Sequence, residues 1–172
     1  AWSPDGKRLA VVSINREQNR LSISSFDTQT KKTDVIYKES SKSFIQLPNE
    51  FTWMKDGVSF VLLKSHANHM RLCRHTVGDS TFKVLTPFDQ DVVKLCAYDS
   101  HHGCLYYELA DADGLNTKIY RVMTDGSSTG FITPEQGQCH DISFSPDFSN
   151  FIYTTSNATQ RISTYAVDYL KS

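Results

Sequence analysis

The sequence lacks an excess of charge of one sign, because 18 lysines and arginines nearly balance 19 aspartates and glutamates in 172 residues. Sequence-independent nucleic-acid binding needs a broad positive surface, and no basic run is longer than Lys31-Lys32. Long apolar runs are missing too, since the most continuous one, Val58 to Leu63, is far shorter than the ~20 residues of a membrane-spanning helix. We therefore expect no nucleic-acid partner and no membrane span in this segment.

Targeting and helix signals are also scarce. The chain opens with Ala1-Trp2, without a charged start and an apolar signal segment, so no targeting signal is visible. No window of about a dozen residues carries apolar side chains at the i, i+3, i+4, i+7 spacing of an amphipathic helix. We therefore expect almost no helix. We also expect one domain, or a portion of one, because a chain of this length can bury its own core.

Short runs rich in β-branched and aromatic residues predict strands, and tight-turn sequences separate them. The clearest predicted strands are Leu9–Ile14, Leu21–Phe26, Phe60–Leu63 and Phe151–Thr155. The turn sequences are Pro4-Asp5-Gly6, Asp56-Gly57, Ser100-His101-His102-Gly103, Asp125-Gly126 and Pro146-Asp147. Together they indicate an all-β protein built from antiparallel hairpins.

The predicted hairpins repeat along the chain. Residues 1–12 align with residues 52–63 without a gap, a third copy begins at Ser143, and residues 96–107 fit with one extra residue in the turn. The anchor residues Trp2, Trp53, Ala97 and Phe144 are then spaced by 51, 44 and 47 residues. A period in the forties with about four strands per unit is typical of β-propeller blades.

Each of the first three units also has a second predicted hairpin. These are Leu21–Phe26 with Asp34–Tyr37, Met70–His75 with Phe82–Thr86, and Lys118–Val122 with Gly130–Pro134. The last unit ends with Arg161–Tyr169, without room for a matching return strand. We expect blade units near 1–48, 49–88, 89–138 and 139–172.

These four units can be read as a closed ring or as an arc of a larger one. Because the chain starts inside a repeat and has no initial Met, we favour a partial arc of a larger propeller over a closed four-bladed ring. An open arc leaves unpaired strand edges, which favours association, such as homodimer formation.

The order of short motifs resembles a known family over nearly the whole chain. The motifs are Trp2–Lys7, Phe51-Thr52-Trp53, Asn68–Leu72, Leu85-Thr86-Pro87, Asp91-Val92-Val93, Leu105-Tyr106-Tyr107, Ile119–Val122, Thr133–Gly137, His140 and Ser143–Asp147. This succession resembles the last four blades of the N-terminal propeller of the dipeptidyl peptidase IV family, within the prolyl oligopeptidase peptidases. The Trp-Ser-Pro-Asp-Gly-Lys run alone is also similar to Tol-type propellers.

The resemblance implies a secreted or periplasmic serine exopeptidase whose propeller caps a C-terminal α/β-hydrolase domain of the same chain. That domain would carry the catalytic triad and cleave peptides, without a cofactor. This chain has no Gly-x-Ser-x-Gly nucleophile elbow and no adjacent Glu pair for the substrate ammonium. It would therefore form a non-catalytic wall that gates and shapes access to the active site. The alternative is a non-enzymatic Tol-type scaffold that binds proteins.

One substrate-binding residue is implied by the resemblance. In the mammalian-type enzymes an aromatic residue shortly before the Phe-Thr strand lines the extended substrate pocket, and Phe44, seven residues before Phe51, matches it. Ile45 stands where the family has an arginine. The alternative reading is that Phe44 packs inside a blade.

Metal sites and disulfides are not favoured. His66, His69, Cys73 and His75 are potential zinc donors, but side chains along one strand do not converge on one point, so we expect no metal. Asp111-Ala112-Asp113-Gly114 lacks the glycine and glutamate that an EF-hand requires later in the loop and predicts a turn. Cys96 and Cys104 flank a turn and could form a bridge, although buried thiols are favoured.

Overall fold

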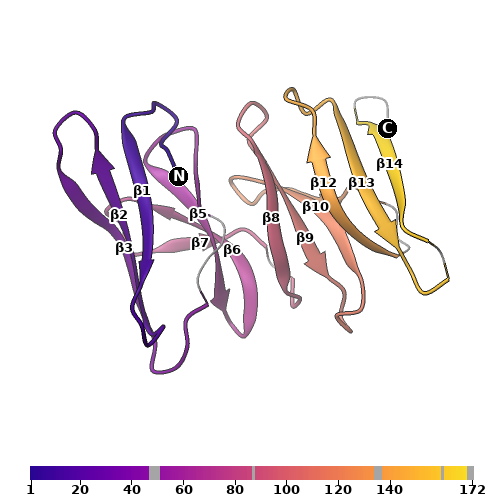
Figure 1. The fold of residues 1–172 in the computed structure, drawn as a ribbon, viewed down its shortest axis with the longest axis horizontal. Coiled ribbons are helices and arrows are strands. Elements are labelled where there is room, and N and C mark those ends of the chain that lie inside the picture. Colours follow the sequence, from indigo (N-terminus) through magenta and orange to yellow (C-terminus); the bar gives the residue numbers. More distant parts are fainter. Residues whose placement is uncertain (47–50, 87, 134–136, 160, 170–172) are drawn as a thin grey trace. The chain divides into compact units, whose positions relative to one another are not determined.

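The computed structural model describes residues 1–46, 51–86, 88–133, 137–159 and 161–169, and every regular element in these ranges is a β-strand (Figure 1). The strands are β1 (Arg8–Ile14), β2 (Arg20–Asp27), β3 (Thr33–Ser40), β4 (Phe51–Trp53), β5 (Ser59–His66), β6 (His69–Thr76), β7 (Phe82–Val84), β8 (Val92–Asp99), β9 (Cys104–Ala110), β10 (Thr117–Met123), β11 (Thr129–Phe131), β12 (Gln138–Phe144), β13 (Asn150–Ser156) and β14 (Ser163–Asp168). The all-β prediction is confirmed. The predicted motif residues Pro87 and Pro134–Gln136 lie outside the described residues.

The strands form four sheets in which sequence neighbours pair. The sheet orders are β1-β2-β3, β4-β5-β6-β7, β8-β9-β10-β11 and β12-β13-β14. Antiparallel pairing runs through all four sheets. Trp2 extends the first sheet through an isolated bridge to Leu9, so the residues before β1 occupy the position that β4 has in the second sheet. This is the blade pattern that the sequence repeat predicts.

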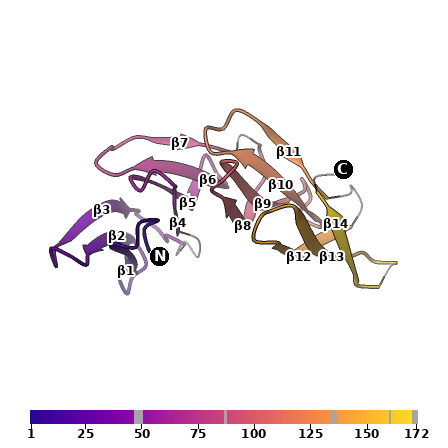
Figure 2. The ribbon, with the colours of Figure 1, turned by 90° about the horizontal axis from the view of Figure 1, so that it is seen from above.

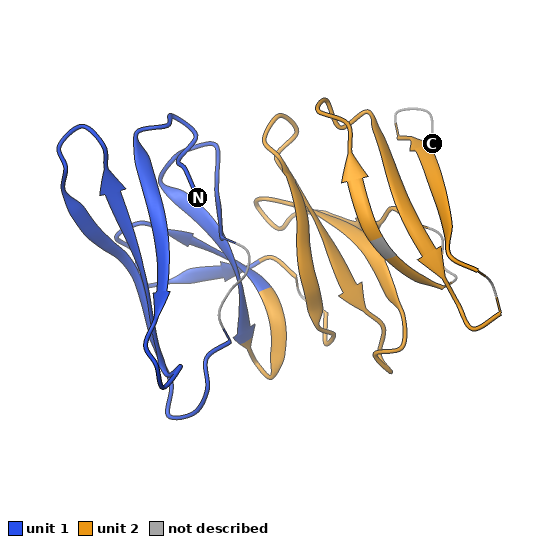
Figure 3. Cartoon of the chain, viewed as in Figure 1, with its two compact units in different colours: residues 1–65, 72–84 blue, residues 66–71, 85–172 orange. Residues whose placement is uncertain are grey.

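The chain divides into two compact units (Figure 3). Unit 1 comprises residues 1–65 and 72–84, and unit 2 comprises residues 66–71 and 85–172. The core of unit 1 contains Ala10, Leu21, Ile23, Ile45, Trp53, Phe60 and Leu62. A core cluster of unit 2 contains Ile119, Cys139, Phe151 and Tyr153. Within unit 2, the sheets β8–β11 and β12–β14 lie side by side (Figures 1 and 2).

The strand register corrects the predicted alignment of the third unit. Trp2 pairs with Leu9 and Trp53 pairs with Phe60, at the same separation along the chain. In the third unit the residue at that separation from its partner Leu105 is Tyr98, not Ala97. The turn therefore contains no extra residue. The misplacement has a physical cause, because β8 has irregular register on both sides of Leu95, which disturbs its side-chain alternation.

The Asp residues of the turns hold them through backbone hydrogen bonds. The Asp5, Asp56 and Asp147 carboxylates each accept the amide N–H two residues later, at 2.9 to 3.1 Å. In the third unit the Asp99 carboxylate has the same role and accepts the amide N–H of His101 at 2.8 Å. Such Asx turns explain why short polar residues punctuate the repeat.

The turn at Asp111 is confirmed as well. Its carboxylate accepts the backbone N–H groups of Leu115 and Asn116 at 2.9 and 3.1 Å. These contacts close a hairpin loop between β9 and β10 rather than presenting oxygens to a cation.

The four cysteines form no disulfide. The register places Cys104 opposite Asp99, whereas Cys96 falls at the irregularity of β8, so the two thiols do not face each other across the hairpin. Cys73, Cys104 and Cys139 are buried, as predicted for unbridged thiols, while Cys96 is half-buried. Within the described ranges, the structure contains no helix suited to crossing a membrane.

Candidate functional site

Phe44 lies on the segment that follows β3 in unit 1. The Ser41 and Ile45 amides donate to the carbonyls of Asn19 and Gln18, at 3.0 and 2.7 Å, and so fix this segment against the turn between β1 and β2. Phe44 between them is 63% exposed, whereas Ile45 is 7% exposed and belongs to the core. Ile45 is therefore the residue that packs into the blade here, and the Phe44 side chain is presented to the surface.

Phe44 lines a pocket of about 310 Å³. Its lining includes Glu39 and Lys64, which form an ion pair at 3.4 Å. Tyr37 joins them, because its hydroxyl accepts from the Lys64 ammonium at 2.8 Å and donates to Glu39 at 2.6 Å. Burial, with the nearby Glu39 carboxylate, raises the pKa of Tyr37 far above its ordinary value. The pocket thus combines an exposed ring with a fixed, partly buried cation.

The residues considered for zinc do not form a metal site. Among the residues that the structure describes, no group of three His, Cys, Asp or Glu side chains is placed to hold a metal ion. His75 instead packs among aromatic rings, with centroid distances of 5.3 Å to Phe60, 4.8 Å to Tyr37 and 5.2 Å to Phe82.

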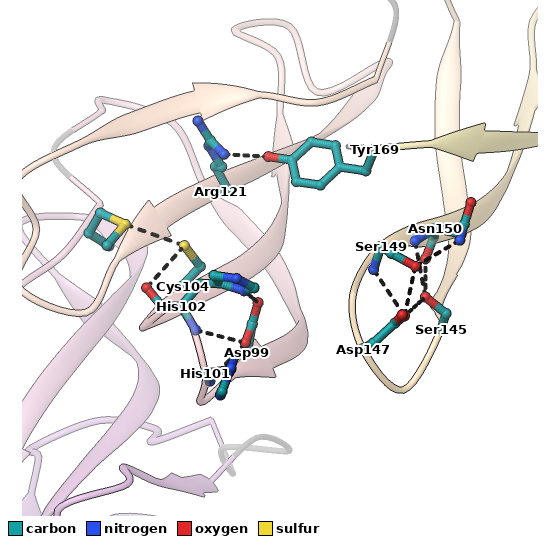
Figure 4. Close-up of polar contacts among 11 residues, drawn as sticks. Asp99, His101, His102, Cys104, Arg121, Ser145, Asp147, Ser149, Asn150 and Tyr169 are labelled. Atoms are coloured by element: carbon teal, nitrogen blue, oxygen red, sulfur yellow. Dashed lines mark hydrogen bonds and ion pairs between the residues drawn. The ribbon is translucent and has the colours of Figure 1, made fainter. Parts of the chain in front are cut away.

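A larger cleft, of about 940 Å³, lies within unit 2. One wall comes from the third sheet and its turns, and the other comes from the fourth sheet (Figure 4). The residues that carry its chemistry are Asp99, His102, Cys104, Tyr106, Arg121, Asp147, Phe148, Ser149, Tyr153 and Tyr169. We call it the unit 2 cleft.

A carboxylate–histidine pair stands at one edge of the cleft. Asp99 is 1% exposed, and its carboxylate contacts His102 Nδ1 at 2.7 Å and accepts the backbone N–H groups of His101 and His102. Burial opposes ionisation of Asp99, but these hydrogen bonds outweigh it and keep the pKa of Asp99 below its ordinary value. Because an ionised carboxylate only accepts, His102 Nδ1 carries the proton and, in the neutral ring, Nε2 is the acceptor.

The opposite edge is the turn between β12 and β13. The Asp147 carboxylate accepts from the hydroxyls of Ser145 and Ser149, at 2.7 and 2.8 Å, and from the Ser149 amide. These hydrogen bonds lower the pKa of Asp147 to about 2. The turn therefore presents a fixed negative charge at neutral pH.

Arg121 and Tyr169 meet across the cleft. The guanidinium of Arg121, on β10, donates to the hydroxyl of Tyr169, which follows β14, and lies 5.7 Å from the centre of the tyrosine ring (Figure 4). Aromatic side chains line the cleft beside this pair, and the Tyr106 and Phe148 rings stack at 5.8 Å with an interplanar angle of 11°.

The thiol in the cleft wall is not activated. Burial raises the pKa of Cys104, and its sulfur lies 3.3 Å from that of Met123. A thiol kept protonated in an apolar contact is a poor nucleophile. The cleft is therefore equipped for binding, through the Arg121 cation, the Asp99 and Asp147 carboxylates, the His102 imidazole acceptor and stacked rings.

The sequence did not predict this cleft. Asp99 and Asp147 were recognisable only as turn residues, and Arg121 and Tyr169 lie 48 positions apart in different sheets. Nothing in local spacing brings them together. The expectation for Phe44 rests only on the family resemblance.

Comparison with solved structures places the fold among β-propellers. The chain superposes with a TM-score of 0.84 on dipeptidyl peptidase 4 of Porphyromonas gingivalis, at 18% identity, over 96% of this chain and 23% of that one. A protein described as a dipeptidyl aminopeptidase IV of Bacteroides ovatus gives 0.82 at 16% identity, over 99% and 27%. TolB of Acinetobacter baumannii gives 0.67 at 17% identity, over 98% and 40%.

These matches cover only a portion of each solved protein, so the chain spans about a quarter of the two peptidases. Its fold is accordingly that of a partial β-propeller, as predicted. The family model described as the dipeptidyl peptidase IV (DPP IV) N-terminal region matches residues 1–162, which is most of the chain. The chain therefore belongs to the family of the dipeptidyl peptidase IV N-terminal region.

Proposed function

We propose that this chain is the non-catalytic propeller portion of a dipeptidyl-peptidase-IV-like serine exopeptidase. The observation that carries the proposal is the family match over residues 1–162, together with four repeated antiparallel sheets. In this role the chain contributes to a wall that gates and shapes peptide access to an active site on another domain. Its partners are a C-terminal α/β-hydrolase domain of the same protein and the peptide substrate.

We assign Phe44 to the wall of the substrate pocket. Three observations support this: the ring is largely exposed, its neighbour Ile45 takes the place in the core, and the adjacent pocket holds the Lys64–Glu39 pair. An exposed ring beside a fixed cation suits a peptide, which offers apolar side chains and carbonyl oxygens.

Three further assignments complete the proposal. The blades comprise residues near 1–48, 49–88, 89–138 and 139–172, each containing one of the four sheets. The protein works in the periplasm or outside the cell. The whole protein forms a homodimer through unpaired strand edges, and its mass in solution tests this assignment.

The direct test is hydrolysis of a Gly-Pro chromogenic substrate by the whole protein that contains this chain. A serine-directed inhibitor should abolish turnover, and the products should be a free dipeptide and the chromophore. A well-folded preparation without turnover would contradict the proposal.

The second candidate is a non-enzymatic propeller that binds proteins. The TolB match supports it, because it covers 98% of the chain, although its TM-score of 0.67 is below those of the peptidases. The two candidates differ in the sequence that the gene encodes after Ser172. A hydrolase domain with a Gly-x-Ser-x-Gly elbow supports the peptidase, and further propeller repeats or a stop codon support the scaffold.

A further inference from the structure

The described lining of the unit 2 cleft contains a cation, Arg121, together with the carboxylates of Asp99 and Asp147. Arg121 contacts the hydroxyl and the ring of Tyr169, and none of the described carboxylates forms an ion pair with it. The guanidinium is planar and offers five N–H donors, of which the contact to Tyr169 engages one nitrogen. The hydrogen bond to the Tyr169 hydroxyl fixes one end of the planar guanidinium before any ligand arrives.

The two carboxylates of the cleft keep their charges but are engaged in hydrogen bonds of their own. Asp99 is ionised, but His102 and two backbone N–H groups satisfy its oxygens. Asp147 is held by two serine hydroxyls on the turn of the opposite wall, and Figure 4 shows that turn apart from Arg121. Arg121 is therefore the charged side chain of the described lining that can recognise an anionic group.

The surface beside Arg121 is aromatic. The buried Tyr106 ring contacts Phe148 at 5.8 Å and Tyr169 at 6.4 Å, and so supports these two half-buried rings beside the guanidinium. Rings of this kind accept an apolar or aromatic group by stacking and edge contacts. His102 Nε2 adds an oriented acceptor for a hydroxyl or N–H group, since Asp99 holds the other ring nitrogen.

We propose that the unit 2 cleft is a binding site for a ligand that carries a carboxylate next to an aromatic or apolar group. The carboxylate bonds to the Arg121 guanidinium, for which a bidentate geometry is favoured. The apolar group lies on the half-buried rings of Phe148 and Tyr169, and an N–H of the ligand donates to His102 Nε2. This site is independent of the Phe44 pocket, so failure of the proposed peptidase function would not affect it.

The test is calorimetric titration of the protein containing the complete chain with N-acetyl-phenylalanine, which has all three features. N-acetyl-phenylalaninamide is the matched neutral probe, and phenethylamine is the cationic one. We expect saturable binding of the acid that weakens as salt is raised, with at least about tenfold weaker binding of the amide. Equal binding of the amide, tighter binding of phenethylamine, or no binding of the acid would overturn the proposal.

Variants then assign the binding to Arg121. Arg121→Gln removes the charge at similar size and should weaken binding of the acid about tenfold or more. Arg16→Gln removes the same charge from an exposed position in unit 1 and should leave affinity unchanged. If Arg121→Gln does not fold, Arg121→Lys is the second variant. It keeps the positive charge but loses the planar set of N–H donors, and should bind the acid with intermediate affinity. Unaltered affinity in a folded Arg121 variant would refute the assignment.

Discussion

The imidazole of His75 lies parallel to the ring of Phe60, with the ring centroids 5.3 Å apart and the planes 9° apart. Tyr37 and Phe82 contact the same imidazole from other directions, and His75 is only 4% exposed. Its Nε2 atom is buried without a hydrogen-bond partner in the described structure. The polar His75 ring is thus buried among aromatic side chains of unit 1. Because a charge is costly to bury there, the protonation state of His75 affects the stability of the fold.

The first prediction concerns pH. Burial, and next the Lys64 ammonium, lower the pKa of His75 to about 4, with Glu39 opposing them weakly. In the unfolded chain His75 binds a proton near pH 6.5, whereas in the folded chain it binds one only near pH 4. The free energy of unfolding therefore falls as the pH drops from about 6.5 to about 4. The loss should reach about 3 kcal/mol.

The substitution His75→Phe isolates this effect. Urea unfolding of both proteins between pH 7 and pH 4 should show that the variant loses less stability on acidification, because the carboxylates that titrate are common to both. Identical acid dependence in the two proteins would show that His75 does not contribute.

The second prediction concerns the hydroxyl that connects Lys64 with Glu39. Tyr37→Phe removes both hydrogen bonds of the Tyr37 hydroxyl and should lower the free energy of unfolding by about 2 kcal/mol, because both partners are charged. Tyr165→Phe is the matched control, since Tyr165 is 48% exposed and the change keeps its ring, so it should be tolerated within about 0.5 kcal/mol. Equal effects of the two substitutions would argue against the network.

The third prediction concerns two glycines with positive φ. A Cβ on Gly137 would lie 2.9 Å from Thr155 Oγ1 and 3.0 Å from the Ser156 carbonyl oxygen, whereas one on Gly114 would meet nothing within 4 Å. Gly114→Ala should cost only the backbone strain, about 1 kcal/mol. Gly137→Ala adds the steric conflict and should cost at least about 1 kcal/mol more. Thermal unfolding of both variants measures the difference, and equal costs would contradict the close approach.

The fourth prediction separates Phe44 from Ile45. Phe44→Ala should change the free energy of unfolding by no more than about 0.5 kcal/mol, whereas Ile45→Ala should cost about 2–4 kcal/mol because it opens a cavity in the core. In the whole protein, Phe44→Ala should raise KM for peptide substrates several-fold. An unchanged KM would leave Phe44 without a role in substrate binding.

The sequence predicts the strands well because their patterns are local. The strands predicted at Leu9–Ile14 and Phe151–Thr155 correspond to β1 and β13 within one residue at each end. The Asp-Gly turns are readable for the same reason, since an Asx turn involves only the next few residues.

Irregular pairing is harder to predict. The β8 irregularities place Tyr98 rather than Ala97 in the repeat position and remove Cys96 from the place opposite Cys104. A bulge inserts one residue without a composition signal, so hydrophobic alternation alone does not reveal it.

The unit 2 cleft could not be predicted, because it depends on packing between sheets. Arg121 on β10 and Tyr169 after β14 come together only when the two sheets lie side by side. Each residue alone is an ordinary side chain of a predicted strand region.

We propose that the chain forms part of the wall of a dipeptide-releasing peptidase. Mass spectrometry of peptides with Pro at the second position, incubated with the whole protein, tests it most directly. We predict stepwise release of the N-terminal dipeptide, and none from the same peptides with a blocked amino terminus. Intact peptides after incubation with a folded preparation, or cleavage at internal sites only, would contradict the account.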